Sequence, residues 1–195
     1  MFIKTILSGF NERLVLNMDF KQSKTYQNIQ SMFMRKLMIS TLYDIYSDKA
    51  TQENYIQINN IFDVTARNEK EHARIFLRKL NDDVLPDTKT NLYDSVNIGS
   101  ETNNLCRNYA ATAREEGYDD IAALFSGIAN IELNHNLVFR SQYDDIIRDQ
   151  VFCKPAESLW ICLQCGNILA GLCAPARCPI CGFPQGYYQI YTAQM

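Results

Sequence analysis

Two stretches of this 195-residue chain match each other without a gap: ENYIQINNIFDVTARNEKEH at residues 53–72 and EGYDDIAALFSGIANIELNH at residues 116–135. Identical or similar residues recur at a constant offset of 63 residues, in the pairs Glu53/Glu116, Tyr55/Tyr118, Ile58/Ile121, Ile61/Leu124, Phe62/Phe125, Ala66/Ala129, Glu69/Glu132 and His72/His135. Each copy ends in Glu-x-x-His, a spacing that places both side chains on one face of a helix. The chain has only two histidines, and both lie in these motifs. The repeat therefore predicts two equivalent helices that each present a carboxylate and an imidazole.

Apolar residues recur at intervals of three and four through much of the first 150 residues, which predicts helices at 25–48, 54–80, 98–116 and 118–148. The polar segment 81–97 contains Pro86, and we expect it to be a long crossover between the second and third helices. Four helices with one long connection indicate an all-α, ferritin-like four-helix bundle.

Glutamate and histidine presented by two facing helices can hold two metal ions inside such a bundle. A complete site also takes a glutamate from each of the other two helices. The first helix offers none, since no Asp or Glu occurs between Asp19 and Asp44. The third helix offers Glu101 as its best candidate. The predicted metal-binding and catalytic residues of the bundle are therefore Glu69, His72, Glu101, Glu132 and His135.

The C-terminal segment differs sharply in composition, because six of the seven cysteines lie in the last 43 residues. Four of them form two Cys-x-x-Cys-Gly motifs separated by twelve residues, Cys162/Cys165 and Cys178/Cys181. Four thiolates from two tight turns are typical of a tetrahedral site for iron or zinc. This segment therefore predicts a second metal site, distinct from the helical one.

Three cysteines remain outside these motifs: Cys106, Cys153 and Cys173. We expect each to be a small packed residue or a free thiol rather than a metal ligand. Disulfides are disfavoured for the tail, since the helical region has no framework of paired cysteines and no convincing secretory signal precedes it. The composition shift and Pro155 place a boundary at residues 151–158. The predicted organisation is an N-terminal extension at 1–20, a helical bundle at 21–150 and a four-cysteine domain at 151–195.

Charge and hydropathy exclude several classes of partner. The net charge of −3, from 19 basic and 22 acidic residues, argues against a nucleic-acid partner. No apolar run of 18 residues occurs, which argues against a membrane-spanning helix. The first 17 residues are largely apolar without a clear cleavage site, so an organellar presequence, a true start at Met18 and a short packed extension all remain open.

Two Glu-x-x-His motifs followed by a CxxC…CPxCG tail resemble rubrerythrin, and the similarity runs from about Lys21 to Ile190. The segments NEKEHAR (68–74) and ATAREEGYDDIA (111–122) and the tail from Trp160 to Tyr188 carry the resemblance. It implies a ferritin-like bundle joined to a rubredoxin-like domain, in a cytoplasmic homodimer. It also implies that the protein reduces hydrogen peroxide at a non-haem di-iron site. Electrons would come from a donor protein or reductase through the four-cysteine iron, with zinc as the alternative metal there.

The resemblance assigns roles to the five bundle residues. Glu69 and Glu132 match the family's bridging carboxylates, His72 and His135 match its histidine ligands, and Glu101 matches the carboxylate that exchanges with a histidine when the redox state changes.

The chain departs from the family at two ligand positions. Lys36 stands at the family's helix-one glutamate and Ile98 at the first glutamate of its third-helix pair, while Tyr43 is retained and Cys106 replaces a second tyrosine. Three carboxylates do not balance two ferrous ions, and an unpaired buried charge is costly. Lys36 is therefore expected either to replace a metal by pairing with Glu69 or Glu101, or to extend to solvent.

Two, one and no bundle metals all remain open at this stage. The alternative functions are an electron-transfer or metal-binding protein with an inactive bundle site, and a structural protein with zinc in its tail.

Overall fold

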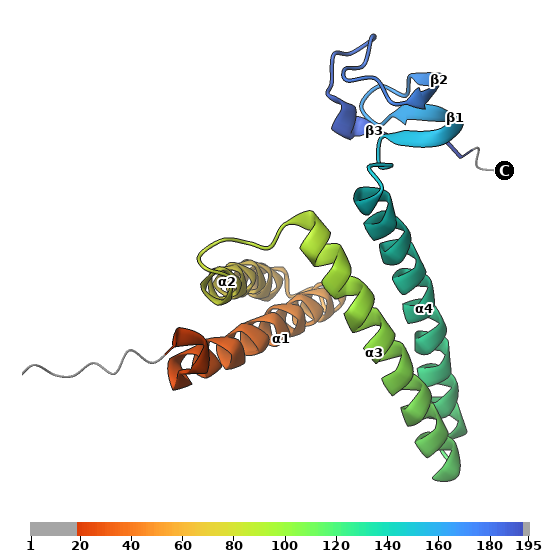
Figure 1. Ribbon diagram of the computed structural model, residues 1–195. Helices are drawn as coiled ribbons and strands as arrows, with labels where there is room; N and C mark the ends of the chain where they lie inside the picture. The colour runs from red at the N-terminus through yellow and green to blue at the C-terminus, as the bar shows by residue number, and fades with distance from the viewer. Residues whose placement is uncertain (1–18, 193–195) are drawn as a thin grey trace, which may run out of the picture. The chain divides into compact units, whose positions relative to one another are not determined.

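The computed structural model describes residues 19–192, which form four long helices, three strands and two short 3-10 helices (Figure 1). In chain order the elements are η1 (Phe20–Gln22), α1 (Lys24–Gln52), α2 (Ile56–Leu80), α3 (Thr88–Glu115), α4 (Asp119–Ile147), β1 (Cys153–Cys162), β2 (Ile168–Cys173), η2 (Gln185–Tyr187) and β3 (Tyr188–Ile190). The chain divides after Pro86 into two compact units, the first holding α1 and α2. The expected extension at residues 1–20 lies outside the described range except for its last two residues.

Helices α1 and α2 pack along each other as a hairpin (Figure 1). The Ser23 hydroxyl caps α1 by accepting a hydrogen bond from the Tyr26 backbone N–H at 3.0 Å. Asn54 takes the left-handed conformation, with φ of 62°, in the turn that leads into α2. Small residues on the facing sides, among them Ala50 and Ala66, are buried and let the two helices approach closely.

Helices α3 and α4 repeat this hairpin at the offset of the sequence repeat. Gly117, with φ of 84°, stands where the first hairpin has Asn54. The Tyr118 N–H donates to the Ala113 carbonyl at 2.8 Å, as the Tyr55 N–H donates to Ala50 at 2.8 Å. The two predicted equivalent helices are confirmed as α2 and α4.

The same repeat extends into the helix–helix contacts. The rings of Tyr46 and Phe62 lie 5.6 Å apart, and those of Tyr109 and Phe125, 63 residues later, also lie 5.6 Å apart. The repeat visible in the sequence does not reach Tyr46 and Tyr109, because the identities between the two copies are dense only along α2 and α4. The repeated unit is therefore a complete two-helix hairpin.

The expected long crossover at 81–97 is wrong, because helix α3 already begins at Thr88. The Asp87 carboxylate caps this helix by accepting a hydrogen bond from the Thr90 N–H at 2.7 Å, and this bond lowers the pKa of Asp87. Val96 is buried, and Tyr93 lies 5.7 Å from the Tyr143 ring on α4. Residues 81–97 have a polar sequence because most of their side chains are exposed. The connection between α2 and α3 covers only residues 81–87.

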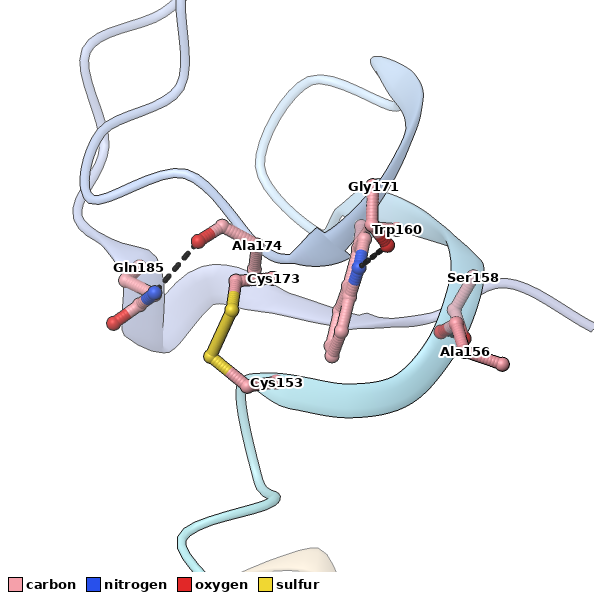
Figure 2. The surroundings of a disulfide bond; sticks show 8 residues. All are labelled: Cys153, Ala156, Ser158, Trp160, Gly171, Cys173, Ala174 and Gln185. Atoms are coloured by element: carbon pink, nitrogen blue, oxygen red, sulfur yellow. Dashed lines mark hydrogen bonds between the residues drawn. A yellow bond between two sulfur atoms is a disulfide. The ribbon is translucent and has the colours of Figure 1, made fainter.

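The C-terminal region is a three-stranded antiparallel sheet in the order β2-β1-β3. Its core consists of Trp160, Cys162, Ala174, Cys178 and Tyr188. The Trp160 indole N–H donates to the Gly171 carbonyl at 3.1 Å, which fastens β1 to β2 from within the core (Figure 2). Strand β1 begins at Cys153, and the domain boundary at residues 151–158 stays a prediction.

Two of the three cysteines expected to be packed residues or free thiols are joined: Cys153 and Cys173 form a disulfide (Figure 2). The expectation was wrong because the β1–β2 register places these residues opposite each other. Cys106 is free and buried, as expected.

None of the helices described between residues 19 and 192 has the length and apolarity needed to cross a bilayer.

Candidate metal centres

The four cysteines of the two CxxC motifs come together as predicted. The sulfurs of Cys162, Cys165, Cys178 and Cys181 all lie within 4.8 Å of one another. The closest approaches are 3.7 Å between Cys162 and Cys181 and 3.6 Å between Cys165 and Cys178. This spacing suits four ligands around one ion.

Both turns that carry these cysteines have the same backbone. The Gly166 N–H donates to the Cys162 carbonyl at 2.8 Å, and the Gly182 N–H donates to the Cys178 carbonyl at 2.9 Å. The two glycines have φ of 76° and 74°, a left-handed conformation that disfavours residues with a Cβ atom. The glycine after each CxxC pair is therefore required by the turn.

The surroundings of the cluster shift the pKa values of its thiols in opposite directions. The nearby Tyr188 hydroxyl, although it makes no hydrogen bond of normal geometry, is the main cause that lowers the pKa of Cys178 to about 6. The Asn167 backbone N–H lowers the pKa of Cys165, but desolvation and the three neighbouring thiols outweigh it and raise that pKa to about 12. Four crowded sulfurs do not all ionise without a compensating positive charge. The donor set thus fits a soft or borderline metal ion such as iron or zinc.

On the first hairpin, Glu69 lies between an imidazole and an ammonium group. His72 Nδ1 is 3.5 Å from Glu69 Oε2, and Lys36 Nζ is 2.5 Å from the same oxygen. The side chains of Lys36 and Glu69 are only 20% and 15% exposed. The Lys36 ammonium is the main cause that lowers the pKa of Glu69, with His72 adding to it and burial opposing it. The contact lacks good hydrogen-bond direction, so it is foremost an ion pair.

On the second hairpin, the equivalent glutamate has no such partner. His135 Nδ1 lies 4.0 Å from Glu132 Oε2, and no lysine or arginine in the described chain forms an ion pair with Glu132. Glu101 on α3 is exposed, and Ile98, one turn before it, is 62% exposed. This hairpin offers an imidazole and carboxylates that form no ion pair with a lysine or arginine of the described chain, and these are suitable metal ligands.

The two hairpins therefore differ in their fit to metal. The expectation that Lys36 pairs with a glutamate is confirmed, and the partner is Glu69. An ammonium on the carboxylate that would bridge two irons does not fit a two-iron site, because it supplies the positive charge that a metal would bring. The four-cysteine site fits a metal, and Glu69 does not fit the bridging of two irons while Lys36 stays in place.

Comparison with known proteins finds matches to both parts of the chain. Residues 38–143 match the family model described as Rubrerythrin, and residues 160–189 match its rubredoxin-like domain. The rubrerythrin of Clostridium perfringens is 37% identical over 187 residues, covering 88% of this chain and 96% of that protein. The rubrerythrin of Nitratidesulfovibrio vulgaris is 30% identical over 182 residues, covering 87% of this chain and 95% of that protein.

Among solved structures, nigerythrin in a mixed-valence state is 20% identical, with a TM-score of 0.33 and coverage of 98% of this chain and 100% of that one. Rubrerythrins bind iron and are generally oxidoreductases that use hydrogen peroxide and electron donors. A family model matched over more than half of the chain, together with a relative 37% identical over most of both sequences, shows that this chain belongs to the rubrerythrin family, with four ferritin-like helices followed by a rubredoxin-like region.

Proposed function

We propose that this protein is an oxidoreductase that carries electrons on an iron ion held by its four-cysteine cluster and passes them to hydrogen peroxide. The observation that carries the proposal is the convergence of the four sulfurs within 4.8 Å. Iron bound by four thiolates supplies a one-electron carrier. Membership of the rubrerythrin family supports iron as the metal and peroxide as the electron acceptor.

The protein around the cluster controls access to it. Cys162 and Cys178 are buried, whereas Cys165 is exposed. Leu163 and Ile180, each inside one CxxC motif, are 58% and 71% exposed and give the cluster an apolar rim. A donor or acceptor can approach there without displacing a ligand, so electrons are expected to enter and leave on the Cys165 side.

The residues that we propose for metal binding and catalysis in the helices are those predicted from the sequence: Glu69, His72, Glu101, Glu132 and His135. Carboxylates and imidazoles are the donor types that hold non-haem iron. The Lys36–Glu69 ion pair reduces the metal capacity of this set, because it leaves Glu101 and Glu132 as the carboxylates without a lysine partner. A separate electron-donor protein or reductase, a homodimer and a cytoplasmic location are part of the same proposal and rest on the family alone.

A second candidate is an electron-transfer or metal-binding protein whose helical site is inactive. The specific observation in its favour is the ion pair, with Nζ 2.5 Å from the Glu69 carboxylate. Ile98 adds to it, since an alkyl side chain supplies no ligand where the family has a glutamate. In this case the four-cysteine iron would cycle with its donor and acceptor, but peroxide would not be consumed at the helices.

The test uses full-length protein purified without oxygen, loaded with iron and reduced. Stopped-flow absorption follows reoxidation of the four-cysteine iron after mixing with hydrogen peroxide, and a peroxide electrode follows turnover. We expect fast, repeated reoxidation in the wild type, a loss of at least tenfold in Glu132→Gln, and no change in Glu115→Gln, a carboxylate at the end of α3. Reoxidation that Glu132→Gln leaves unchanged would support the electron-transfer candidate instead. A protein that accepts only zinc in the four-cysteine site would overturn both peroxide reduction and electron transfer, and would leave metal binding alone.

A further inference from the structure

The disulfide between Cys153 and Cys173 joins the first residue of β1 to the last residue of β2 (Figure 2). The two residues are direct partners in the antiparallel ladder, with Cα atoms 4.0 Å apart. Beside them the Ala174 N–H donates to the Phe152 carbonyl at 2.8 Å, which is the ladder hydrogen bond on this side. Cys153 and Cys173 therefore occupy a non-hydrogen-bonded position of the ladder, next to a hydrogen-bonded one. Residues opposite each other at such a position have their side chains close together. The backbone thus holds the two sulfurs face to face whether or not they are bonded.

The sheet does not depend on this bond. Beyond a shift of register after Cys153, the strands pair continuously from Ser158 opposite Gly171 to Ile161 opposite Ile168. The Trp160 indole is fully buried against this part of the ladder. On the other side, the Gln185 side-chain amide donates to the Ala174 carbonyl at 2.6 Å (Figure 2). These contacts hold both ends of the bridged segment, so we expect the reduced form to keep its fold.

Access to the two sulfurs is unequal. Cys173 is exposed and Cys153 is half-buried, and neither belongs to the four-cysteine cluster. An exposed thiol with a second thiol held opposite it is the arrangement in which oxidation proceeds to a disulfide rather than to higher acids. The same exposure admits a reducing thiol to the bonded form.

We propose that Cys153 and Cys173 form a second, metal-independent redox site that is oxidised by hydroperoxides and reduced by a dithiol. The Cys173 thiolate attacks one peroxide oxygen, the O–O bond breaks, and with the thiol proton the products are a sulfenic acid and water. The Cys153 thiolate then attacks the Cys173 sulfur, an S–S bond forms, and the S–O bond breaks to release a second water. The two thiols lose two electrons and two protons, and one hydrogen peroxide becomes two waters. Because it needs no iron, this reaction goes beyond the function proposed above.

The experiment uses the full-length chain with zinc in the four-cysteine site, so that no metal in the protein changes oxidation state. The protein is reduced with dithiothreitol, freed of reductant and treated with one equivalent of hydrogen peroxide. Thiols are then alkylated and counted by mass spectrometry. We expect peroxide to remove two alkylated thiols per chain, to link the peptides of Cys153 and Cys173, and to be reversed by dithiothreitol without loss of circular dichroism. Cys173→Ser is expected to abolish the loss, and Cys106→Ala is expected to leave it intact.

Three results would overturn the proposal. In the first, both thiols stay open to alkylation after peroxide. In the second, dithiothreitol reduces the bond only when the chain is unfolded, which indicates a purely structural bridge. In the third, the reduced chain loses its circular dichroism. If Cys173→Ser does not fold, Cys153→Ala serves in its place. If neither variant folds, the oxidation and reduction of the wild-type chain decide alone. Peroxide turnover by the iron-loaded protein is measured separately, so failure of one proposal leaves the other intact.

Discussion

Replacing Lys36 by glutamate tests how many metal ions the helices hold. In the wild type, Lys36 Nζ lies 2.5 Å from Glu69 Oε2, with the two side chains 20% and 15% exposed. Coulomb's law gives an attraction of about 7 kcal/mol for that separation at an effective dielectric constant of 20, and about 2 kcal/mol in bulk water. Desolvation and screening by the remaining solvent offset most of it, so we expect the pair to add about 1–2 kcal/mol to the free energy of unfolding.

Lys36→Glu changes the summed charge of this pair from zero to two negative charges. Without metal, the two carboxylates repel each other, and we expect the free energy of unfolding to fall by about 2–4 kcal/mol. Ferrous ion then binds where the ammonium was. At a free concentration one hundred times its dissociation constant, it returns about 2.7 kcal/mol. The metal content is expected to rise from about two ions per chain, one in the four-cysteine cluster and one in the helices, to about three.

The assay combines elemental mass spectrometry with thermal denaturation, with and without ferrous ion, in the absence of oxygen. Lys36→Met is the control, because it removes the ammonium without adding a ligand. It should lose the stability of the ion pair and gain less metal than Lys36→Glu. The reasoning would be refuted by wild-type protein that already holds about three irons, or by a Lys36→Glu variant that binds no more metal than the wild type.

Three further predictions follow from individual contacts. Cys178→Ser should lose the four-cysteine iron and its visible absorption, whereas Cys106→Ala should keep both, as read by elemental analysis and absorption spectra. Asn136→Ala should lower the free energy of unfolding by about 1–3 kcal/mol, because its buried amide donates to a backbone carbonyl and to a serine hydroxyl of α3; the exposed Asn134→Ala on the same helix should change it little in urea denaturation. Since the pKa of Glu69 is lowered in the folded state, its contribution to stability is present above the unfolded pKa of about 4.3 and is lost as the pH falls through the folded value. The free energies of unfolding of the wild type and of Lys36→Met, measured from pH 3 to pH 7, should therefore differ most near pH 7. A difference that is the same at every pH would contradict this.

The helices and their repeat were predictable because the information is local. Residues three and four apart lie on one helix face, so the pattern of residues 53–72 and 116–135 was enough to identify α2 and α4. The start of α3 was missed because the side chains of its first ten residues are mostly exposed and give only a weak apolar pattern. There the deciding feature is the Asp87 cap, which polar composition alone did not distinguish from a loop.

The four-cysteine cluster was predictable for a related reason. Each Cys-x-x-Cys-Gly motif determines its own turn, with a hydrogen bond back to the first cysteine and a left-handed glycine. The four-cysteine site then forms once the fold brings these two turns together. By contrast, the five bundle residues lie on two hairpins, and the spacing of residues along one helix does not determine how side chains of separate hairpins meet.

By itself, the sequence determined the family, the helical repeat and the cysteine ligands, since each is written in the spacing of residues close together in the chain. Only the tertiary structure decided that Lys36 pairs with Glu69 rather than extending to solvent, because that depends on how α1 packs against α2. Only the β1–β2 register brought Cys153 opposite Cys173, twenty residues later. A shift of one residue in a ladder turns every side chain to the opposite face, so pairing between strands is a property of the folded sheet.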